Sequence, residues 1–251
     1  MPSARTAALP LFIAAAALST SVIAQGSCAK PLYLSFDTGH MGVAPLVAEV
    51  LERQDVRVTF FAAAERTQTG GDSLDSQWAP WWKARAAEGH EFASHTYDHV
   101  YWRGDDKSIE PRFRIAPSAG AFAGREFTWT AAQYCDNIAK SAERLQLITG
   151  KKPLPLFRAP GGKTSPKLLA SAKACGWAHV GWAPAGFLGD ELPSEKFSNE
   201  KLLAHLGIWS RKDPWAPANL EPLIVGLKEK GFCFRTLREH PQYQAWIAAH
   251  P

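Results

Sequence analysis

The chain has 251 residues, of which 46% are hydrophobic, and a formal net charge of +4 at neutral pH. This length and apolar content suffice for one sizeable core, so we expect a single domain. The basic residues are scattered rather than clustered in runs, which argues against a nucleic-acid partner. Ten Trp, five Tyr and thirteen Phe residues supply rings that can stack on sugars, although most rings in such a domain belong to its core.

Residues 1–24 have the pattern of an export signal. Arg5 supplies the positive charge, residues 7–17 form an apolar run, and small residues precede a cleavage point after Ala24. We therefore expect residues 25–251 to form the mature domain in a secreted or periplasmic location. No later stretch approaches the roughly 18 uninterrupted apolar residues of a membrane span, so we expect no transmembrane segment after cleavage.

Four cysteines remain after residue 24, and an even number in an oxidising compartment predicts disulfides. The three pairings among Cys28, Cys135, Cys175 and Cys233 stay open. Since no Cys-x-x-Cys occurs, a thiolate zinc knuckle or a redox motif is disfavoured.

Strands and helices alternate in the first part of the chain. Apolar runs and helical spacing predict a strand over 32–36, a helix over 43–53, a strand over 58–63, a helix over 78–87 and a strand over 91–94. The last of these strands leads directly into His95.

The stretch from Val100 to Thr128 breaks this pattern, because glycine and proline recur throughout it. We expect a long loop there, and loops of this length in compact domains are usually functional or mobile. The loop is predicted to form a wall of a substrate groove, where Trp102 and Arg103 would contact sugar.

Alternation resumes after residue 130. The pattern predicts a helix over 131–149 ended by Gly150, a strand over 156–159, a helix from Ser165 to Gly176, strands over 178–182 and 201–205, a helix over 219–230 and a strand over 232–236. Strands that alternate with helices indicate an α/β fold with a parallel sheet, wound into a barrel or a distorted barrel.

Four reactive side chains follow predicted strands: Asp37, His95, Arg158 and His205. Each has a purely structural interpretation, as a turn acid, a packed histidine or a salt-bridge partner. Because the chemistry of parallel α/β barrels gathers at the carboxyl ends of the strands, their equivalent positions favour a shared site.

His95 and His99 are four residues apart. If Thr96 opened a helical turn, both rings would lie on one face with Cβ atoms about 5–6 Å apart and could reach one metal ion. Two exposed histidines on an ordinary helix are the alternative, since two ligands do not complete the usual three-ligand catalytic zinc site.

These segments resemble the polysaccharide deacetylases of the NodB-homology class, carbohydrate esterase family 4. Ser35–Gly39 is similar to the family's Thr/Ser-Phe-Asp-Asp-Gly motif, and Gly89–His99 fits its glycine-led His-Ser/Thr-x-x-His motif. Phe157–Gly162 resembles the Arg-x-Pro-x-Gly motif, and Leu202–Leu237 resembles the closing Leu-x-His region. The resemblance implies a single-domain distorted (β/α) barrel of the NodB-homology type.

The resemblance also implies roles for residues of this sequence. It assigns Asp37 as general base, His205 as general acid and Arg158 as the group that orients Asp37. It further assigns His95 and His99 as ligands of a divalent metal, zinc in the first place, with cobalt, nickel or manganese as alternatives. A backbone N–H near Gly161, beside Pro160, would hold the oxyanion of an acetyl group under attack.

Two departures from the family pattern stand out. The second Asp of the first motif, a metal ligand in the family, is Thr38 here, and a neutral hydroxyl is a much weaker ligand than a carboxylate. Either His40 or Asp37 could complete the coordination. The family's carboxylate after the fifth strand is also missing from Trp182–Gly186, where Asp190 could substitute.

The leading hypothesis is a monomeric, secreted, metal-dependent hydrolase that removes acetyl groups from acetylated sugars, with N-acetylglucosamine-containing glycan as the first candidate. The alternative is a glycan-binding protein that keeps the fold but has lost part of the metal site. An aspartic protease is disfavoured, because Asp37-Thr38-Gly39 has no second Asp-Thr/Ser-Gly partner in the sequence.

Overall fold

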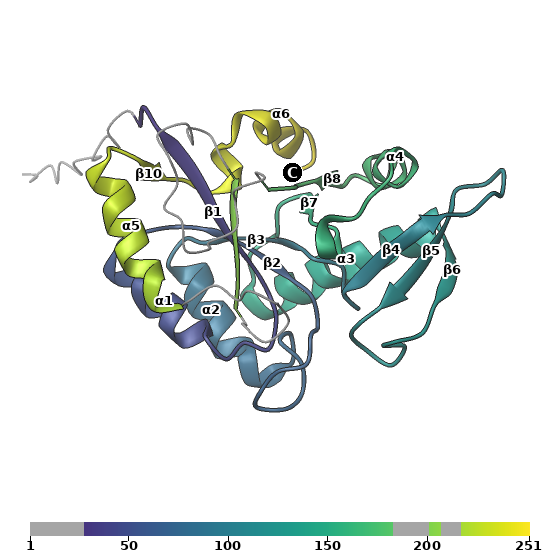
Figure 1. The fold of residues 1–251 in the computed structure, drawn as a ribbon, viewed down its shortest axis with the longest axis horizontal. Helices are drawn as coiled ribbons and strands as arrows, with labels where there is room; N and C mark the ends of the chain where they lie inside the picture. Colours follow the sequence, from purple (N-terminus) through teal and green to yellow (C-terminus); the bar gives the residue numbers. More distant parts are fainter. Residues whose placement is uncertain (1–27, 183–200, 207–216) are drawn as a thin grey trace, which may run out of the picture.

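The computed structural model describes residues 28–182, 201–206 and 217–251. The predicted export signal, Ala183–Gly186 and Asp190 therefore lie outside the described residues. Within them, a parallel sheet has the strand order β10-β1-β2-β3-β7-β8, and β9 also pairs with β1 (Figure 1). Its strands are β1 (Pro31–Asp37), β2 (Thr59–Ala62), β3 (Glu91–Ser94), β7 (Leu156–Phe157), β8 (Ala178–His179), β9 (Lys201–His205) and β10 (Cys233–Phe234).

Helices alternate with these strands and make the fold a distorted α/β barrel, as predicted. They are α1 (Ala44–Arg53), α2 (Ala79–Ala87), α3 (Ala131–Thr149), α4 (Pro166–Ala174), α5 (Leu220–Glu229) and α6 (Pro241–Ala249). The predicted bounds of α3 and β9 are confirmed, while β8 and β10 are shorter than expected. Helix α6 was not predicted; it begins at Pro241, where the His240 side chain accepts from the backbone of Gln242.

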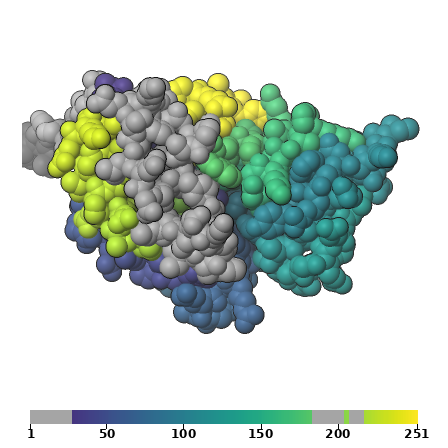
Figure 2. Space-filling view, in the orientation of Figure 1, coloured from purple at the N-terminus to yellow at the C-terminus, as the bar shows by residue number. Residues whose placement is uncertain are grey.

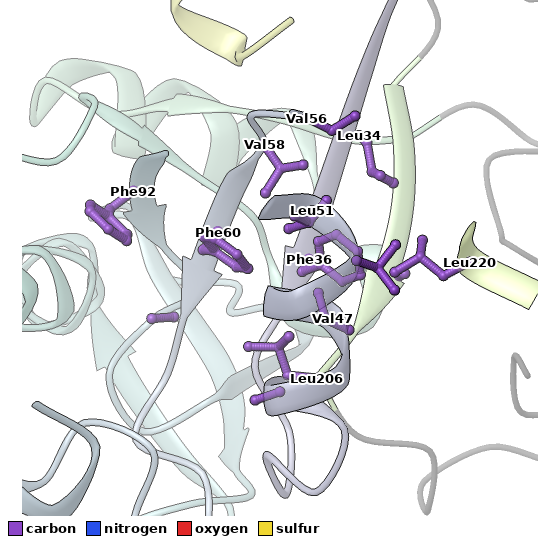
Figure 3. Close-up of a cluster of buried hydrophobic side chains, with 14 of the residues drawn as sticks. Leu34, Phe36, Val47, Leu51, Val56, Val58, Phe60, Phe92, Leu206 and Leu220 are labelled. Carbon is purple, nitrogen blue, oxygen red and sulfur yellow. The ribbon is translucent and has the colours of Figure 1, made fainter. Parts of the chain in front are cut away.

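Strand β1 shows how the sheet separates its core from its site. Leu32, Leu34 and Phe36 alternate along it and join the largest cluster of buried side chains, with residues of α1 and α5 (Figure 3). Ser35 and Asp37 fall on the opposite face and are also buried. Period-two alternation therefore places Ser35 and Asp37 inside the barrel and the apolar Leu32, Leu34 and Phe36 under the helices.

The prediction of a long loop over residues 100–128 is wrong. Strands β4 (Val100–Asp105), β5 (Arg112–Pro117) and β6 (Phe127–Thr130) form a three-stranded antiparallel sheet. It projects from one end of the molecule in Figures 1 and 2. Phe113 and Ile115 of β5 are fully buried in a cluster with residues of α3 and α4. The glycines and prolines thus punctuate short strands.

Two disulfides connect distant parts of the chain and settle the open pairing. Cys28 bonds to Cys233, which links the start of β1 to β10. Cys135 bonds to Cys175, which links α3 to the end of α4. None of the helices in the described ranges is long and apolar enough to span a membrane.

Candidate functional site

Asp37 ends β1 and is held by a buried arginine. Arg158, which follows β7 and is fully buried, donates from Nη1 to Asp37 Oδ1 at 2.6 Å and from Nη2 to Ser35 Oγ at 2.8 Å. Its guanidinium carbon also lies 4.0 Å from the centroid of the Phe61 ring. The structure therefore brings Asp37 and Arg158 together as an oriented charge pair.

The second carboxylate oxygen of Asp37 faces two histidines. Its Oδ2 lies 3.5 Å from His95 Nε2 and 3.8 Å from His205 Nε2. His205 reaches this position because β9 pairs with β1 in a register that sets it opposite Asp37. Burial raises the pKa of Asp37, but Arg158 and the two histidines together outweigh it and leave that pKa below its ordinary value. The carboxylate is thus ionised at neutral pH.

The segment from His95 to His99 is a tight turn, so the expected helical turn at Thr96 is wrong. Thr96 and His99 have left-handed backbones, with φ of 60° and 47°. The Thr96 hydroxyl accepts from the N–H of Val100 at 2.7 Å. The turn still brings the two imidazoles together, with ring centroids 4.8 Å apart. The four-residue spacing thus correctly predicted that the two imidazoles are neighbours, although the segment between them is a turn and not a helix.

Helix α3 holds this turn in its strained conformation. The backbone carbonyl of Asn137 accepts from Tyr97 N at 2.9 Å. Its side chain accepts from Asp98 N at 3.1 Å and donates to Asp98 Oδ2 at 2.7 Å. Left-handed non-glycine residues cost on the order of 1–3 kcal/mol each, and such contacts are what keep them in place.

Hydrogen bonds at Nδ1 orient both histidine rings. His95 Nδ1 lies 2.8 Å from the carbonyl oxygen of Arg158, which can only accept, so this nitrogen carries the proton. His99 Nδ1 contacts Ser118 Oγ, whose own proton points to the carbonyl of His99 at 3.3 Å. Each Nε2 is then a lone-pair donor aimed into the site, the orientation typical of metal-ligating histidines.

Glu65, which the sequence reasoning missed, faces the second histidine. Its Oε1 lies 3.9 Å from His99 Nε2, and its Oε2 accepts from the Thr38 hydroxyl at 2.7 Å. Burial lowers the pKa of His99 by more than the nearby Glu65 raises it, so this pKa lies below its ordinary value. The only sequence signal for Glu65 was its position three residues beyond β2, since carboxylates that closely follow barrel strands are site candidates.

His40 keeps its ring within its own turn. Its Nδ1 accepts from the N–H of Gly42 at 2.9 Å, and burial lowers its pKa while Glu65 acts in the opposite direction. A role for His40 as a metal ligand stays a prediction.

The segment Pro160–Gly162 approaches the β4 strand beside the site. Gly161 has φ of +67°, and a Cβ there would lie 2.9 Å from Cε1 of Tyr101. The Tyr101 ring in turn contacts the His99 ring, with centroids 5.0 Å apart. Tyr101 therefore connects the expected oxyanion segment, which includes buried Pro160, to the histidine turn.

Trp102 and Arg103 lie on β4, so they belong to a strand and not to a loop. The Arg103 guanidinium lies 5.3 Å from the Tyr101 ring centroid, and Trp102 Nε1 donates to Asp105 at 3.1 Å. Their contact with sugar stays a prediction.

The chemistry of these donors fits a divalent cation. No group of three or more His, Cys, Asp or Glu side chains among residues 28–182, 201–206 and 217–251 is spaced to hold a metal ion as it stands. At two places, however, an imidazole lone pair faces a carboxylate: His95 faces Asp37, and His99 faces Glu65. A cation between such acceptors would satisfy both.

Comparison with known proteins places these features in a family. The model of the polysaccharide deacetylase family matches residues 24–180. The chain is 25% identical over 217 residues to the peptidoglycan-N-acetylmuramic acid deacetylase PdaA of Bacillus subtilis (strain 168). The match covers 83% of this chain and 70% of that protein.

Solved structures share the fold at lower identity. The B. subtilis PdaA structure, a family 4 carbohydrate esterase, has a TM-score of 0.59 and 21% identity, and the match covers 86% of this chain and 82% of that one. A family 4 acetyl xylan esterase from Clostridium thermocellum, solved with a cobalt ion, has a TM-score of 0.59 and 21% identity over 86% of this chain and 92% of that one.

The family match spans the chain from before β1 to the end of β8, and the fold agrees with it. It confirms the resemblance that the motifs carried. The chain therefore belongs to the polysaccharide deacetylase family, the carbohydrate esterase family 4 hydrolases.

Proposed function

We propose that the protein is a secreted or periplasmic, metal-dependent hydrolase that removes acetyl groups from acetylated sugars, with N-acetylglucosamine-containing glycan as its substrate class. The observation that carries this proposal is the Asp37 carboxylate, which is buried, ionised and flanked by two imidazoles on one oxygen. The two disulfides and the predicted export signal support a location outside the cytoplasm.

Asp37 is arranged to act as a general base. Arg158 occupies Oδ1, so the proton of an attacking water would be accepted at Oδ2. Arg158 is itself held by hydrogen bonds to Ser35 Oγ and to the Val180 carbonyl, so its contact with Oδ1 orients the carboxylate and Oδ2 keeps facing the histidines. When bound, a divalent cation supplies Lewis acidity, which polarises the acetyl carbonyl and makes water more acidic.

His205 is arranged to act as the general acid. Its Nε2 lies 3.8 Å from Asp37 Oδ2, the carboxylate oxygen that does not accept from Arg158. A proton on that nitrogen would pass to the amine or alkoxide that leaves with the sugar. A backbone N–H near Gly161 would donate to the developing oxyanion.

The test is acetate release from N-acetylated chitooligosaccharides and from peptidoglycan fragments in the presence of zinc or cobalt. His205→Asn should lower the rate by about 10²–10⁴-fold, the usual contribution of a general acid. Asp37→Asn should be at least as slow. Glu49→Gln, which changes an exposed carboxylate on α1, is the control and should match the wild type.

Far-UV circular dichroism of each variant separates lost chemistry from lost folding. If folded His205→Asn and folded Asp37→Asn both released acetate at the wild-type rate, the mechanism would be wrong.

A catalytically silent glycan-binding protein is the second candidate. The observation that favours it is Thr38, whose hydroxyl brings no negative charge to the place where the family pattern has a carboxylate. Retention of the wild type on a chitin or peptidoglycan column, without uptake of zinc and without acetate release, would support this candidate over the hydrolase.

A further inference from the structure

We propose that Glu65 replaces the missing carboxylate of the first motif as a metal ligand, and that Thr38 has become its positioning residue. The cation would then be held by His95, His99 and Glu65. The inference rests on the proposed metal-dependent function and names the third ligand that the sequence left open.

The strand order makes this replacement geometrically direct. Strand β2 lies between β1 and β3 in the sheet. Thr38 follows β1, His95 follows β3, and Glu65 follows β2, the strand between them. A carboxylate that is lost from the end of one strand is thus resupplied from the end of its neighbour.

Hydrogen bonds hold the Glu65 side chain in place. The Thr38 hydroxyl accepts from Ala63 N at 2.9 Å and donates to Glu65 Oε2 at 2.7 Å. This arrangement leaves Oε1 as the oxygen that faces His99. The Ala63 carbonyl lies farther from the same hydroxyl, at 3.3 Å, so the shorter contact to Glu65 Oε2 takes the proton and turns Oε1 toward the histidines.

The backbone of Glu65 is equally constrained. The buried Ser73 donates from its backbone N–H to the Glu65 carbonyl at 2.9 Å, and its hydroxyl oxygen accepts from the Glu65 N–H at 3.3 Å. The Glu65 side chain is only 14% exposed. Both the backbone and the side chain of Glu65 are therefore held by neighbouring groups, as a metal ligand requires.

The separation of the facing atoms is close to what a shared ion needs. Two ligand atoms that are each about 2.1 Å from a tetrahedral zinc ion lie about 3.4 Å from one another. Glu65 Oε1 and His99 Nε2 are 3.9 Å apart, so a small rotation of the carboxylate would bring them into range. The same spacing is too long for a direct hydrogen bond between the two groups.

Metal affinity, measured by calorimetric titration with zinc and by elemental analysis after dialysis, tests the proposal without reference to activity. The wild type should bind one equivalent. Glu65→Gln keeps the shape of the side chain and the acceptor for Thr38 but removes the charge, and it should raise Kd by at least about 100-fold. Thr38→Val should raise Kd by about 10-fold, as expected for a group that only orients a ligand.

A rescue variant makes the test specific. Thr38→Asp in the Glu65→Gln background returns a carboxylate to the position of the family motif, and it should recover most of the lost affinity. Glu143→Gln, the same chemical change at an exposed position of α3, is the matched control and should bind zinc as the wild type does.

Three outcomes would overturn the proposal: Glu65→Gln binds zinc as tightly as the wild type, the wild type takes up no zinc, or Thr38→Asp fails to rescue folded Glu65→Gln. Acetate release is scored separately. A wild type that deacetylates glycan with a zinc affinity independent of Glu65 would retain the proposed function and refute this inference. Glu65-dependent zinc binding without acetate release would do the reverse.

Discussion

The two sides of the site are built from different kinds of structure. Asp37 and His205 come from the ends of regular strands, and Arg158 directly follows β7. Glu65, His99 and Ser118 come instead from the loops and turns that follow β2, β3 and β5. The strand side is positioned by sheet register, which opposes Asp37 to His205. The loop side is positioned by individual hydrogen bonds, one of which joins Glu65 to Thr38, the residue that departs from the family motif.

This difference suggests where change is tolerated. A residue fixed by register cannot move without shifting a whole strand, and a one-residue slip would turn every side chain of that strand to the other face. A carboxylate on a loop can be replaced by one on an adjacent loop, provided that local hydrogen bonds hold the replacing side chain in position. Thr38 and Glu65 are consistent with such an exchange.

The largest predicted effect lies on the strand side. Arg158→Met should lower the free energy of unfolding by about 3–5 kcal/mol, because it leaves Asp37 as a buried charge without its cation. Urea denaturation measures the change. Adding Asp37→Asn should return part of the loss, since it removes the unpaired charge. Arg53→Met, which breaks an exposed ion pair with Glu221, is the control and should change stability little.

If Arg158→Met were no more destabilising than Arg53→Met, the sheet register alone would position Asp37 and His205. The ion pair between Arg158 and Asp37 would then be unnecessary for stability.

The second prediction separates the pH response of the site from that of the core. His90 precedes β3 at the end opposite to His95, and its Nδ1 accepts from Val58 N at 3.1 Å. Burial lowers the pKa of His90 from 6.5 to about 4. Between these values the unfolded chain binds a proton that the folded chain does not, so stability should fall by about 3 kcal/mol as the pH decreases from 6.5 to 4.

His90→Asn keeps an acceptor for Val58 and removes the titration, so the unfolding free energy of this variant should depend less on pH in that window. Urea midpoints at several pH values are the measurement. An unchanged pH profile would assign the acid sensitivity to other groups, including those of the site.

The smallest predicted effect lies on the loop side. Asn137→Ala removes the two side-chain hydrogen bonds to Asp98 and should cost about 1–2 kcal/mol of stability. Amide hydrogen exchange should increase most at residues 96–99, because the turn that contains the left-handed Thr96 and His99 loses support. Asp136→Ala, at an exposed position one residue earlier on α3, is the control. Equal exchange in the two variants would mean that the turn keeps its conformation without the Asn137 side chain.

The same contrast explains how far the sequence could be interpreted. Residues that follow strands, such as Asp37 and Arg158, were predictable because apolar runs mark the strands and barrels gather chemistry at one end. The contact between Glu65 and Thr38 was not, since it depends on the course of the loop between β2 and α2. The antiparallel sheet was missed because its strands are short and interrupted, and glycine near a bulge resembles a loop signal.

The antiparallel sheet has one further consequence. Its inner end, where β5 leads into Ser118, fixes His99, whereas the β4–β5 turn at its outer end carries Ile109, which is fully exposed. Residues can therefore be inserted or exchanged at this tip without disturbing the imidazole at its base. An engineer who wishes to graft a new glycan-recognition peptide onto this hydrolase should begin at that tip.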